Sequence, residues 1–177
     1  DVMTTGNRPM DRWKDIPWTR VEREVFKLQR RIYRASVRND RKTVHKLQRL
    51  LMKSRSGRLL AVRRVSQDNM GKKTAGVDGV KLLTPKQRVV LSQTLRVDGK
   101  AQPLRRTWIP KPGSAEKRPL GIPTLRDRAS QTLVKQALEP EWEARFEPNS
   151  YGFRPGRSCH DAIEALFKVI RLQPKWV

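Results

Sequence analysis

Two cations, Lys111 and Arg118, flank a short stretch with the composition of a β-hairpin. Residues 104–110 (LRRTWIP) have the pattern of a strand, residues 111–117 (KPGSAEK) of a connection, and residues 118–122 (RPLGI) of a return strand. Lysine can hold an anion as a point charge, and arginine can hold it through a forked contact. The pair could therefore clamp a triphosphate or backbone phosphates, although a solvated turn with ordinary surface cations explains the same residues.

Residue types for nucleophilic or metal-dependent catalysis do not occur at suitable spacing. His45 and His160 lie far apart, and neither has a second histidine at metal-ligand spacing. Cys159 is adjacent to His160, whereas a nucleophile and its base must face each other. No paired carboxylates stand at the predicted strand ends, and the glycine-rich stretch lacks the GKS/T ending of a P-loop. The residues alone predict an anion-contacting surface and neither a catalytic nor a metal site.

The charge of the chain indicates a polyanionic partner. The 177 residues include 40 Lys and Arg against 17 Asp and Glu, a formal net charge of +23. Self-repulsion on this scale is unfavourable unless a polyanion offsets it, and nucleic acid is the usual one because phosphate contacts release counterions. An anionic membrane surface is the second candidate. No apolar run approaches the roughly 18 residues of a spanning helix, so no membrane crossing is expected.

Much of this charge lies in a predicted helical extension, residues 19–65, which follows a lead-in of residues 1–18. Apolar residues recur at spacings of three and four, and Thr19 and Asp40 are suitable N-caps for two successive helices. From position 20 to position 64 there are 16 Lys and Arg and 3 Asp and Glu. Charge runs are usually solvated helix faces, but such faces mix both signs, so this one favours phosphate contact.

The rest of the chain is predicted to form a loop and a small mixed domain. Residues 66–81 contain three glycines and no periodicity, which indicates a loop. Residues 82–177 follow, with helices capped by Thr84 and Thr124 on either side of the hairpin. The expected fold class is α+β, a mostly helical basic extension followed by a small antiparallel sheet flanked by helices.

The helices after the hairpin carry two further expectations. Pro140 is expected to stop or bend the first of them, because proline cannot donate a backbone hydrogen bond. The last helix, from about position 161 to 172, has apolar residues at helical spacing that are expected to face a core, namely Ile163, Leu166, Phe167 and Ile170. Positions 175–177 have the pattern of the start of a strand.

Three segments in this order resemble the group II intron reverse transcriptases, also called maturases. Residues 62–80 (VRRVSQDNMGKKTAGVDGV) resemble the loop that precedes the polymerase fingers, with TAGVDG as the specific part. Residues 103–140 resemble the first finger motif and its helix, through IPKP, RPLGIP and the DRA segment. Residues 149–165 resemble the second finger motif, through SYGFRPGRS. With the basic extension, the resemblance runs from about Trp13 to Val177.

The resemblance implies roles for individual residues. Lys111 and Arg118 match positions that contact the incoming nucleotide triphosphate. The residues that match the template path, in the lid-like loop, the strand-to-helix corner and the second motif, are Gly76, Gly79, Gly121, Ile122, Pro123, Tyr151, Phe153 and Arg154. The basic helices match a surface that grips structured intron RNA, with Arg23, Arg30, Arg31, Arg34 and Arg38. Tyr151 and Phe153 could stack on bases, although a core position is favoured for Phe153.

The resemblance also implies what a complete enzyme contains. In the family, the next strand and a later Ala-Asp-Asp turn supply the aspartates that hold two Mg²⁺ ions, and no Tyr-X-Asp-Asp occurs in this sequence. Mg²⁺ is therefore expected with ligands outside this chain, which alone is not expected to polymerise. The chain is interpreted as part of a longer protein, as a shortened chain, or as one half of a split enzyme.

The partners that the resemblance implies are group II intron RNA, target DNA, a dNTP, and the remainder of the reverse transcriptase on the same or a second polypeptide.

The single cysteine excludes an internal disulfide and fits a reducing compartment, the bacterial cytoplasm or an organelle. Two alternatives stay open. One is a non-catalytic structural-RNA-binding protein derived from a finger domain. The other is a general basic DNA-binding protein, which the motifs disfavour.

Overall fold

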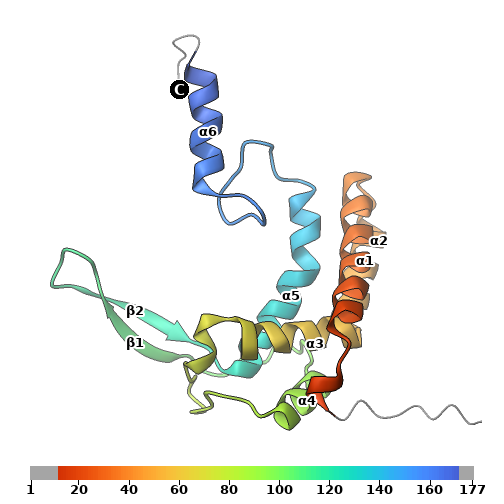
Figure 1. The fold of residues 1–177 in the computed structure, drawn as a ribbon, viewed down its shortest axis with the longest axis vertical. Helices are drawn as coiled ribbons and strands as arrows, with labels where there is room; N and C mark the ends of the chain where they lie inside the picture. Colours follow the sequence, from red (N-terminus) through yellow and green to blue (C-terminus); the bar gives the residue numbers. More distant parts are fainter. Residues whose placement is uncertain (1–11, 172–177) are drawn as a thin grey trace, which may run out of the picture.

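A computed structural model describes residues 12–171 as a mostly helical chain with a β-hairpin (Figure 1). In chain order the elements are η1 (Trp13–Asp15), α1 (Trp18–Val37), α2 (Arg41–Lys53), α3 (Arg55–Arg63), η2 (Arg64–Asp68), η3 (Met70–Lys73), α4 (Pro85–Thr94), β1 (Arg105–Pro110), β2 (Lys117–Ile122), α5 (Leu125–Glu143) and α6 (Cys159–Ile170). The expected α+β class is confirmed, with an antiparallel hairpin flanked by helices. Positions 1–11 of the lead-in and the strand expected near position 175 lie outside the described residues.

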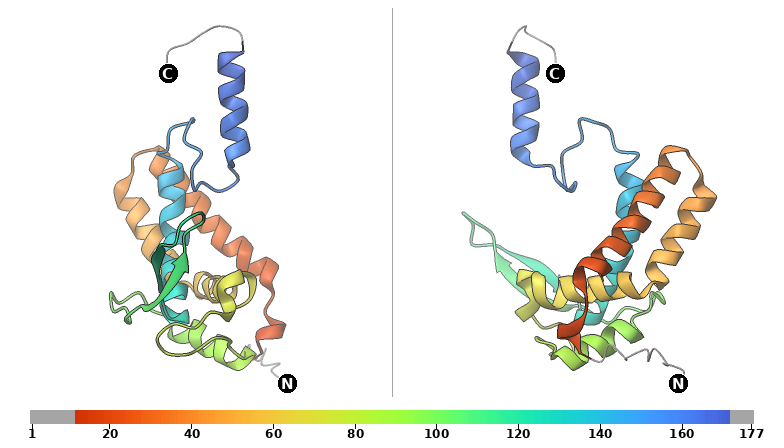
Figure 2. Two further views of the ribbon diagram at one scale, coloured as in Figure 1. Left: turned by 90° about the vertical axis from the view of Figure 1, so that its left-hand side faces the viewer. Right: turned by 45° about the vertical axis from the view of Figure 1, so that its right-hand side comes forward.

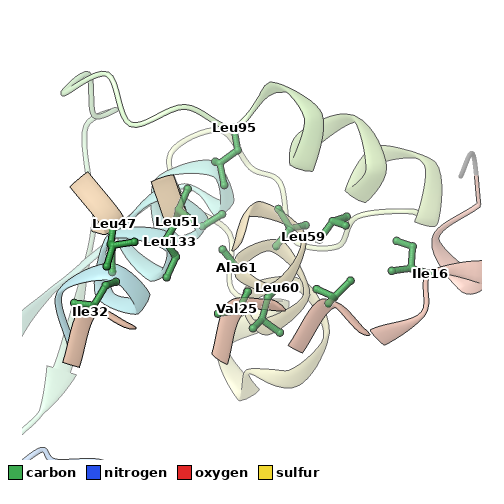
Figure 3. Close-up of a cluster of buried hydrophobic side chains, with 14 of the residues drawn as sticks. Ile16, Val25, Ile32, Leu47, Leu51, Leu59, Leu60, Ala61, Leu95 and Leu133 are labelled. Carbon is green, nitrogen blue, oxygen red and sulfur yellow. The ribbon is translucent and has the colours of Figure 1, made fainter. Parts of the chain in front are cut away.

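Four helices, α1, α2, α3 and α5, pack around one apolar core (Figure 3). Along α1, Val25 and Ile32 are buried seven residues apart, because two helical turns return a side chain to the same face. Leu51 of α2, Leu60 of α3 and Leu133 of α5 meet this face from the other helices. The inner side of α1 is therefore fully used in packing, and its outer side is left to solvent.

Capping side chains explain where three of the helices begin. Asp40 accepts a hydrogen bond from the backbone N–H of Thr43 at 3.0 Å before α2. Thr84 and Gln87 form a reciprocal capping box before α4, whose first residue is proline. Thr124 Oγ1 accepts from the backbone of the third residue of α5 at 3.1 Å. These three predicted caps are confirmed, because a capping oxygen satisfies N–H groups that have no partner inside the helix.

The predicted start of α1 is wrong, and of the two alternatives expected at Pro140, a stop or a bend, the stop is contradicted. α1 begins one residue before Thr19, because the carbonyl of Pro17 already accepts hydrogen bonds from the backbone N–H groups of Arg20 and Val21. α5 continues through Pro140 to its end three residues later. Proline leaves the carbonyl of Gln136 without its helical donor, and Nε2 of Gln29 on α1 donates to that oxygen at 3.0 Å instead. A neighbouring helix thus replaces the hydrogen bond that Pro140 removes.

The predicted loop after the basic helices is partly helical. A π turn, η2, continues α3, and a short 3-10 helix, η3, follows it before the irregular segment that leads to α4. Trp13 packs the start of the described chain against this region, since its Nε1 donates to Gln67 Oε1 at 2.7 Å. The ring of Trp13 also meets that of Trp18 edge to face, with centroids 4.9 Å apart.

β1 and β2 form an arm that projects from the helices (Figures 1 and 2). The register pairs Ile109 with Arg118 and Trp108 with Pro119. Because residues that face each other share one side of a hairpin and successive residues alternate, Arg118 and Trp108 lie on opposite faces. Among the strand residues, Ile122 at the base of the arm is buried. Both faces of the arm are therefore open over most of their length.

α6 stands away from the helical core (Figures 1 and 2). The predicted helix is confirmed, but its predicted packing is wrong within residues 12–171. The side chains expected to face a core are 53% to 62% exposed, and they are Ile163, Leu166, Phe167 and Ile170. Helical periodicity shows that a helix has an apolar face, whereas it carries no information about what covers that face.

Candidate nucleic-acid interface

The lid-like loop lies directly on the corner where the hairpin leads into α5. A Cβ placed on Gly76 would lie 2.7 Å from the backbone N and Cα of Thr124 and 2.9 Å from the carbonyl carbon of Pro123. Glycine is therefore the residue that permits this contact. Gly79 has a φ of +70° and donates its N–H to the carbonyl of Gly76 at 3.3 Å. The structure thus brings together Gly76, Gly79 and Pro123, which the resemblance assigns to the template path.

The strand side of this corner contains one buried residue. Ile122, at the end of β2, is 8% exposed. Gly121 precedes it and pairs with Arg106 across the hairpin. A Cβ on Gly121 would meet the Leu104 side chain, at 2.7 Å from Cδ1, so a flexible group rather than backbone limits that position. Template contact by these residues stays a prediction.

Arg128 of α5 holds the segment before Gly76 through hydrogen bonds to its backbone. Patterns in the sequence assigned no individual role to this residue. Its Nη1 donates to the carbonyl of Gly71 at 2.8 Å, and its Nη2 donates to the carbonyl of Thr74 at 2.6 Å. Burial lowers the pKa of Arg128, and the carboxylate of Asp78 acts in the opposite direction. The DRA segment marks the helix that carries this arginine, but not the direction in which its side chain points.

Lys111 and Arg118 have different surroundings on the hairpin. Lys111 Nζ lies 2.6 Å from Glu116 Oε2, and both side chains are largely exposed. Arg118 makes no ion pair among residues 12–171, and it faces Ile109 across the hairpin. An exposed ion pair contributes at most about 1 kcal/mol, so a multivalent phosphate can displace Glu116 from Lys111. The arrangement suits an anion that meets Arg118 directly and competes for Lys111.

Arg154, assigned to the template path, is used inside the chain. It is 7% exposed, and its Nε and Nη2 contact the carboxylate of Glu143 at 3.1 Å and 2.6 Å. Its Nη1 donates to the carbonyls of Glu147 and Ser150, each at 2.8 Å. Arg154 thereby fixes the loop of residues 147–157 to the end of α5. A contact with template stays a prediction for this residue, and the geometry gives it a positioning role.

Phe153 is not a core residue, which corrects the favoured interpretation from the sequence. Its side chain is fully exposed, and its φ of +57° is rare for a bulky residue. Neighbouring Tyr151 is half-buried, with the guanidinium of Arg157 placed 5.4 Å from its ring centroid. An aromatic ring that a strained backbone holds in solvent suits stacking on a base, and this role of Phe153 stays a prediction.

We expect Glu143→Gln to loosen the 147–157 loop. Loss of the charge-assisted hydrogen bonds from Arg154 should speed amide exchange in this loop by about ten-fold at neutral pH. The hydrogen bonds from Arg154, with its charge, lower the pKa of Glu143 in the folded chain. Their stabilisation is therefore complete above the unfolded pKa of the carboxyl and is lost as pH falls through the lower folded value.

Hydrogen–deuterium exchange across a pH series checks this expectation. The difference between wild type and Glu143→Gln should disappear in acid. Glu164→Gln is the matched control, because Glu164 pairs with Lys168 on α6, at 2.5 Å, and both side chains are exposed. This control should leave exchange in the 147–157 loop unchanged. A difference for Glu143→Gln that persists at the acid end would contradict the assignment.

The outer face of α1 carries cations along its length. All five arginines that were matched to RNA contact are exposed, four of them on α1 and the fifth at its C-cap, and they are Arg23, Arg30, Arg31, Arg34 and Arg38. With 3.6 residues per turn, Arg23, Arg30 and Arg34 form one stripe opposite the buried face. Phe26 and Tyr33 lie along one side of the stripe, and their side chains are 58% and 43% exposed. We call these five arginines the α1 basic face.

The acidic residues of α1 do not neutralise this face. Oε1 of Glu22 accepts from Arg63 of α3 at 3.0 Å. Glu24 accepts from Ser56 of α3 and, at 3.0 Å, from Arg20 on its own helix. The hydrogen bond from Ser56, and to a smaller extent that from Arg20, lowers the pKa of Glu24. The carboxylate therefore stays charged, and it is already paired within the chain. Among residues 12–171, the α1 basic face makes no ion pair, so its charge is available to an external anion.

The described part of the chain offers no constellation of metal ligands. Among residues 12–171 there is no group of three or more His, Cys, Asp or Glu side chains that could hold a metal ion. These residues therefore do not fit the Mg²⁺ that the resemblance implies. None of the described helices combines the length and apolar character needed to span a bilayer.

Comparison with known proteins defines the class. A family profile described as the N-terminal domain of reverse transcriptase matches residues 13–95. A second profile, described as reverse transcriptase (RNA-dependent DNA polymerase), matches residues 109–176. The chain therefore combines the N-terminal domain of a reverse transcriptase with part of the polymerase domain.

The relatives define the family within this class. Maturase-like protein 1 of Euglena gracilis is 37% identical over 80% of this chain and 31% of its own length. Protein YkfC of Escherichia coli K12 is 46% identical over 58% of this chain and 28% of its own length. Group II intron-encoded protein LtrA of Lactococcus lactis subsp. cremoris is 49% identical over 37% of this chain and 11% of its own length. The chain belongs to the group II intron reverse transcriptase/maturase family, as its N-terminal region, and spans less than a third of the length of these relatives.

Proposed function

We propose that this chain binds group II intron RNA, assists its splicing, and supplies the fingers for RNA-templated DNA synthesis in intron mobility. The observation that carries the proposal is the α1 basic face, whose exposed arginines make no ion pair among residues 12–171. Proteins recognise structured RNA largely through its shape, phosphates and 2′-hydroxyls, which suits a broad basic face. Membership of a family that includes a group II intron-encoded protein supports the same partner.

Assistance in splicing requires binding energy rather than catalytic groups on the protein. A protein that binds the active fold of an RNA more tightly than its inactive folds increases the population of the active fold. The α1 basic face would supply such contacts while the RNA performs the splicing chemistry.

In DNA synthesis the hairpin would hold the incoming dNTP, and the loop around Gly76 would lie beside the template. Catalysis would require Mg²⁺ and its ligands from the remainder of the reverse transcriptase, on the same or a second polypeptide, with target DNA as the further substrate. We place this activity in a bacterial cytoplasm or an organelle. Relatives from Escherichia coli and a mitochondrial maturase of Arabidopsis thaliana support that range.

A binding titration tests the RNA part of this proposal. The chain is titrated with intron RNA and with a scrambled RNA of the same length at several salt concentrations. Tighter binding of the intron RNA is expected at every salt concentration, and equal affinities would contradict the proposal. Primer extension after addition of the remaining polymerase tests the second part. Intron binding without any extension would favour the non-catalytic RNA-binding alternative.

In the completed enzyme, we expect Lys111→Ala or Arg118→Ala to raise the KM for nucleotide about 10- to 100-fold while sparing RNA affinity. That range corresponds to losing one hydrogen bond to a charged group. Lys117→Ala is the matched control, since Lys117 precedes Arg118 and lies on the other face of the hairpin. Steady-state primer extension and RNA binding are measured for each variant. Loss of RNA affinity with a normal nucleotide KM would reverse the assignment.

A further inference from the structure

A second group of cations surrounds a cavity that the α1 basic face does not reach. The cavity has a volume of about 470 Å³ and lies between α2, α3 and the segment after α4. Its lining consists of Arg49, Met52, Lys53, Arg58, Arg96 and Val97. A smaller neighbouring cavity, of about 170 Å³, shares Arg58 and Arg96 and adds Arg55. We call the larger one the basic cavity, and none of its lining residues is acidic or belongs to α1.

Two of these arginines are held in place by backbone carbonyls. Arg58 Nη1 donates to the carbonyl of Gln93 at 3.1 Å. Arg96 Nη1 donates to the same carbonyl and to that of Leu95, each at 2.9 Å. Each guanidinium has five N–H donors, so these contacts fix its orientation and leave other donors for a ligand. The basic cavity is thus partly preorganised for an anion.

The backbone carbonyls at the end of α4 balance only part of the positive charge around the basic cavity. A helix C-terminus carries roughly half a negative charge and attracts cations, and Gln93 lies in the last turn of α4. Four cations line the basic cavity, so the charge remains strongly positive after this contribution. Burial, together with the charges of Arg96 and Arg55, lowers the pKa of Arg58, as expected where like charges converge. The described residues provide no carboxylate in the lining to relieve this repulsion.

We propose that the basic cavity binds backbone phosphates of RNA, as a second contact separate from the α1 basic face. The proposal rests on the RNA-binding function proposed above and adds a second point of attachment on another side of the helices. Guanidinium groups hold phosphate oxygens through forked contacts, and Lys53 adds a point charge. Free polyphosphate has the same chemistry, so the experiment separates it from RNA.

The test compares two double variants of α2 with equal charge. Arg49→Gln/Lys53→Gln removes two cations from the cavity, and neither makes an ion pair among residues 12–171. Arg41→Gln/Lys42→Gln removes two exposed cations at the other end of the helix, outside the cavity. The full chain is titrated with intron RNA and with scrambled RNA from 50 to 200 mM salt. Sodium pyrophosphate is titrated separately at constant ionic strength.

The expected result is a salt slope smaller by about two for the cavity variant with either RNA, because two phosphate contacts are lost. The control variant should change the slope by much less. Equal slopes for the two variants would overturn the proposal. A second result would also overturn the proposal: the cavity variant alone loses pyrophosphate binding, while its salt slope with RNA equals that of the control variant. The cavity would then bind a free polyphosphate and not RNA. Equal affinity of the chain for intron and scrambled RNA would instead reject the proposed function. The difference in salt slope between the cavity and control variants would still show whether the basic cavity binds phosphate.

Discussion

Replacement of Arg23, Arg30 and Arg34 by glutamate is expected to remove most of the affinity of this chain for RNA. These three residues form the central stripe of the α1 basic face, and all are exposed. Each phosphate contact contributes roughly 0.9 to the slope of log affinity against log salt, so the slope should fall by about three. Three new carboxylates also repel the RNA backbone, and at low salt the Kd should rise on the order of a hundred-fold or more.

A charge-conserving variant separates charge from other effects of these substitutions. Arg23→Lys/Arg30→Lys/Arg34→Lys keeps the three cations but replaces each forked donor with a point charge. This variant should keep the salt slope of wild type and lose only part of the affinity. Thermal unfolding of both variants should match wild type, because the substituted side chains lie outside the core. An unchanged salt slope in the glutamate variant would show that α1 does not contact phosphate.

Gly76→Ala is expected to have the largest effect on the lid-like loop. The added Cβ would lie 2.7 Å from the backbone of Thr124, and backbone cannot rotate aside as a side chain can. The loop and the corner after Pro123 must therefore separate. Overpacking of this kind costs about 1–3 kcal/mol. For a chain of this size, the midpoint of thermal unfolding should fall by roughly 2–4 °C for each kcal/mol.

Gly71→Ala provides the control for Gly76→Ala. Gly71 also precedes the corner in sequence, but the nearest atoms to its added Cβ would be Asn69 Oδ1 at 3.6 Å and Arg128 Nη1 at 3.7 Å. These are ordinary contacts, so thermal unfolding of Gly71→Ala should lie close to wild type. In the completed enzyme, primer extension should decline for Gly76→Ala and not for Gly71→Ala. Equal unfolding midpoints for the two variants would mean that the loop adapts without cost.

The sequence predicted helix starts and the hairpin well where these depend on interactions between residues close together in the chain. Asp40, Thr84 and Thr124 were identified as caps because a side-chain oxygen next to an apolar helical pattern satisfies nearby N–H groups. The hairpin followed from two short runs around a Pro-Gly connection. The stop expected at Pro140 does not occur, and the carbonyl of Gln136 that Pro140 leaves without a helical donor is satisfied by Gln29, which is 111 positions before Pro140. A hydrogen bond between distant residues leaves no local pattern.

The candidate site was predictable in outline but not in the orientation of its side chains. Gly76 and Pro123 were assigned to one region through the resemblance, and the structure places them in contact. Arg154 was assigned to RNA, although its guanidinium is engaged by a carboxylate and two carbonyls of the chain itself. Phe153 was matched to the template path with a core position favoured, yet its side chain is fully exposed on a backbone with a φ of +57°. Residue type sets what a side chain can do, and backbone geometry sets which partner it meets.

The hydrogen bond that spans Pro140 has a consequence for how the molecule assembles. The carbonyl of Gln136 gains its donor from α1, and Ser36 of α1 donates to the carbonyl of Glu141 one turn further on, at 3.1 Å. Buried carbonyls without donors are costly, so α5 is complete only when α1 is docked on it. The helix that bears the arginine stripe and the helix that supports the hairpin therefore form one cooperative folding unit. When α1 is docked with its arginine stripe facing solvent, α5, which supports the hairpin, is therefore also folded.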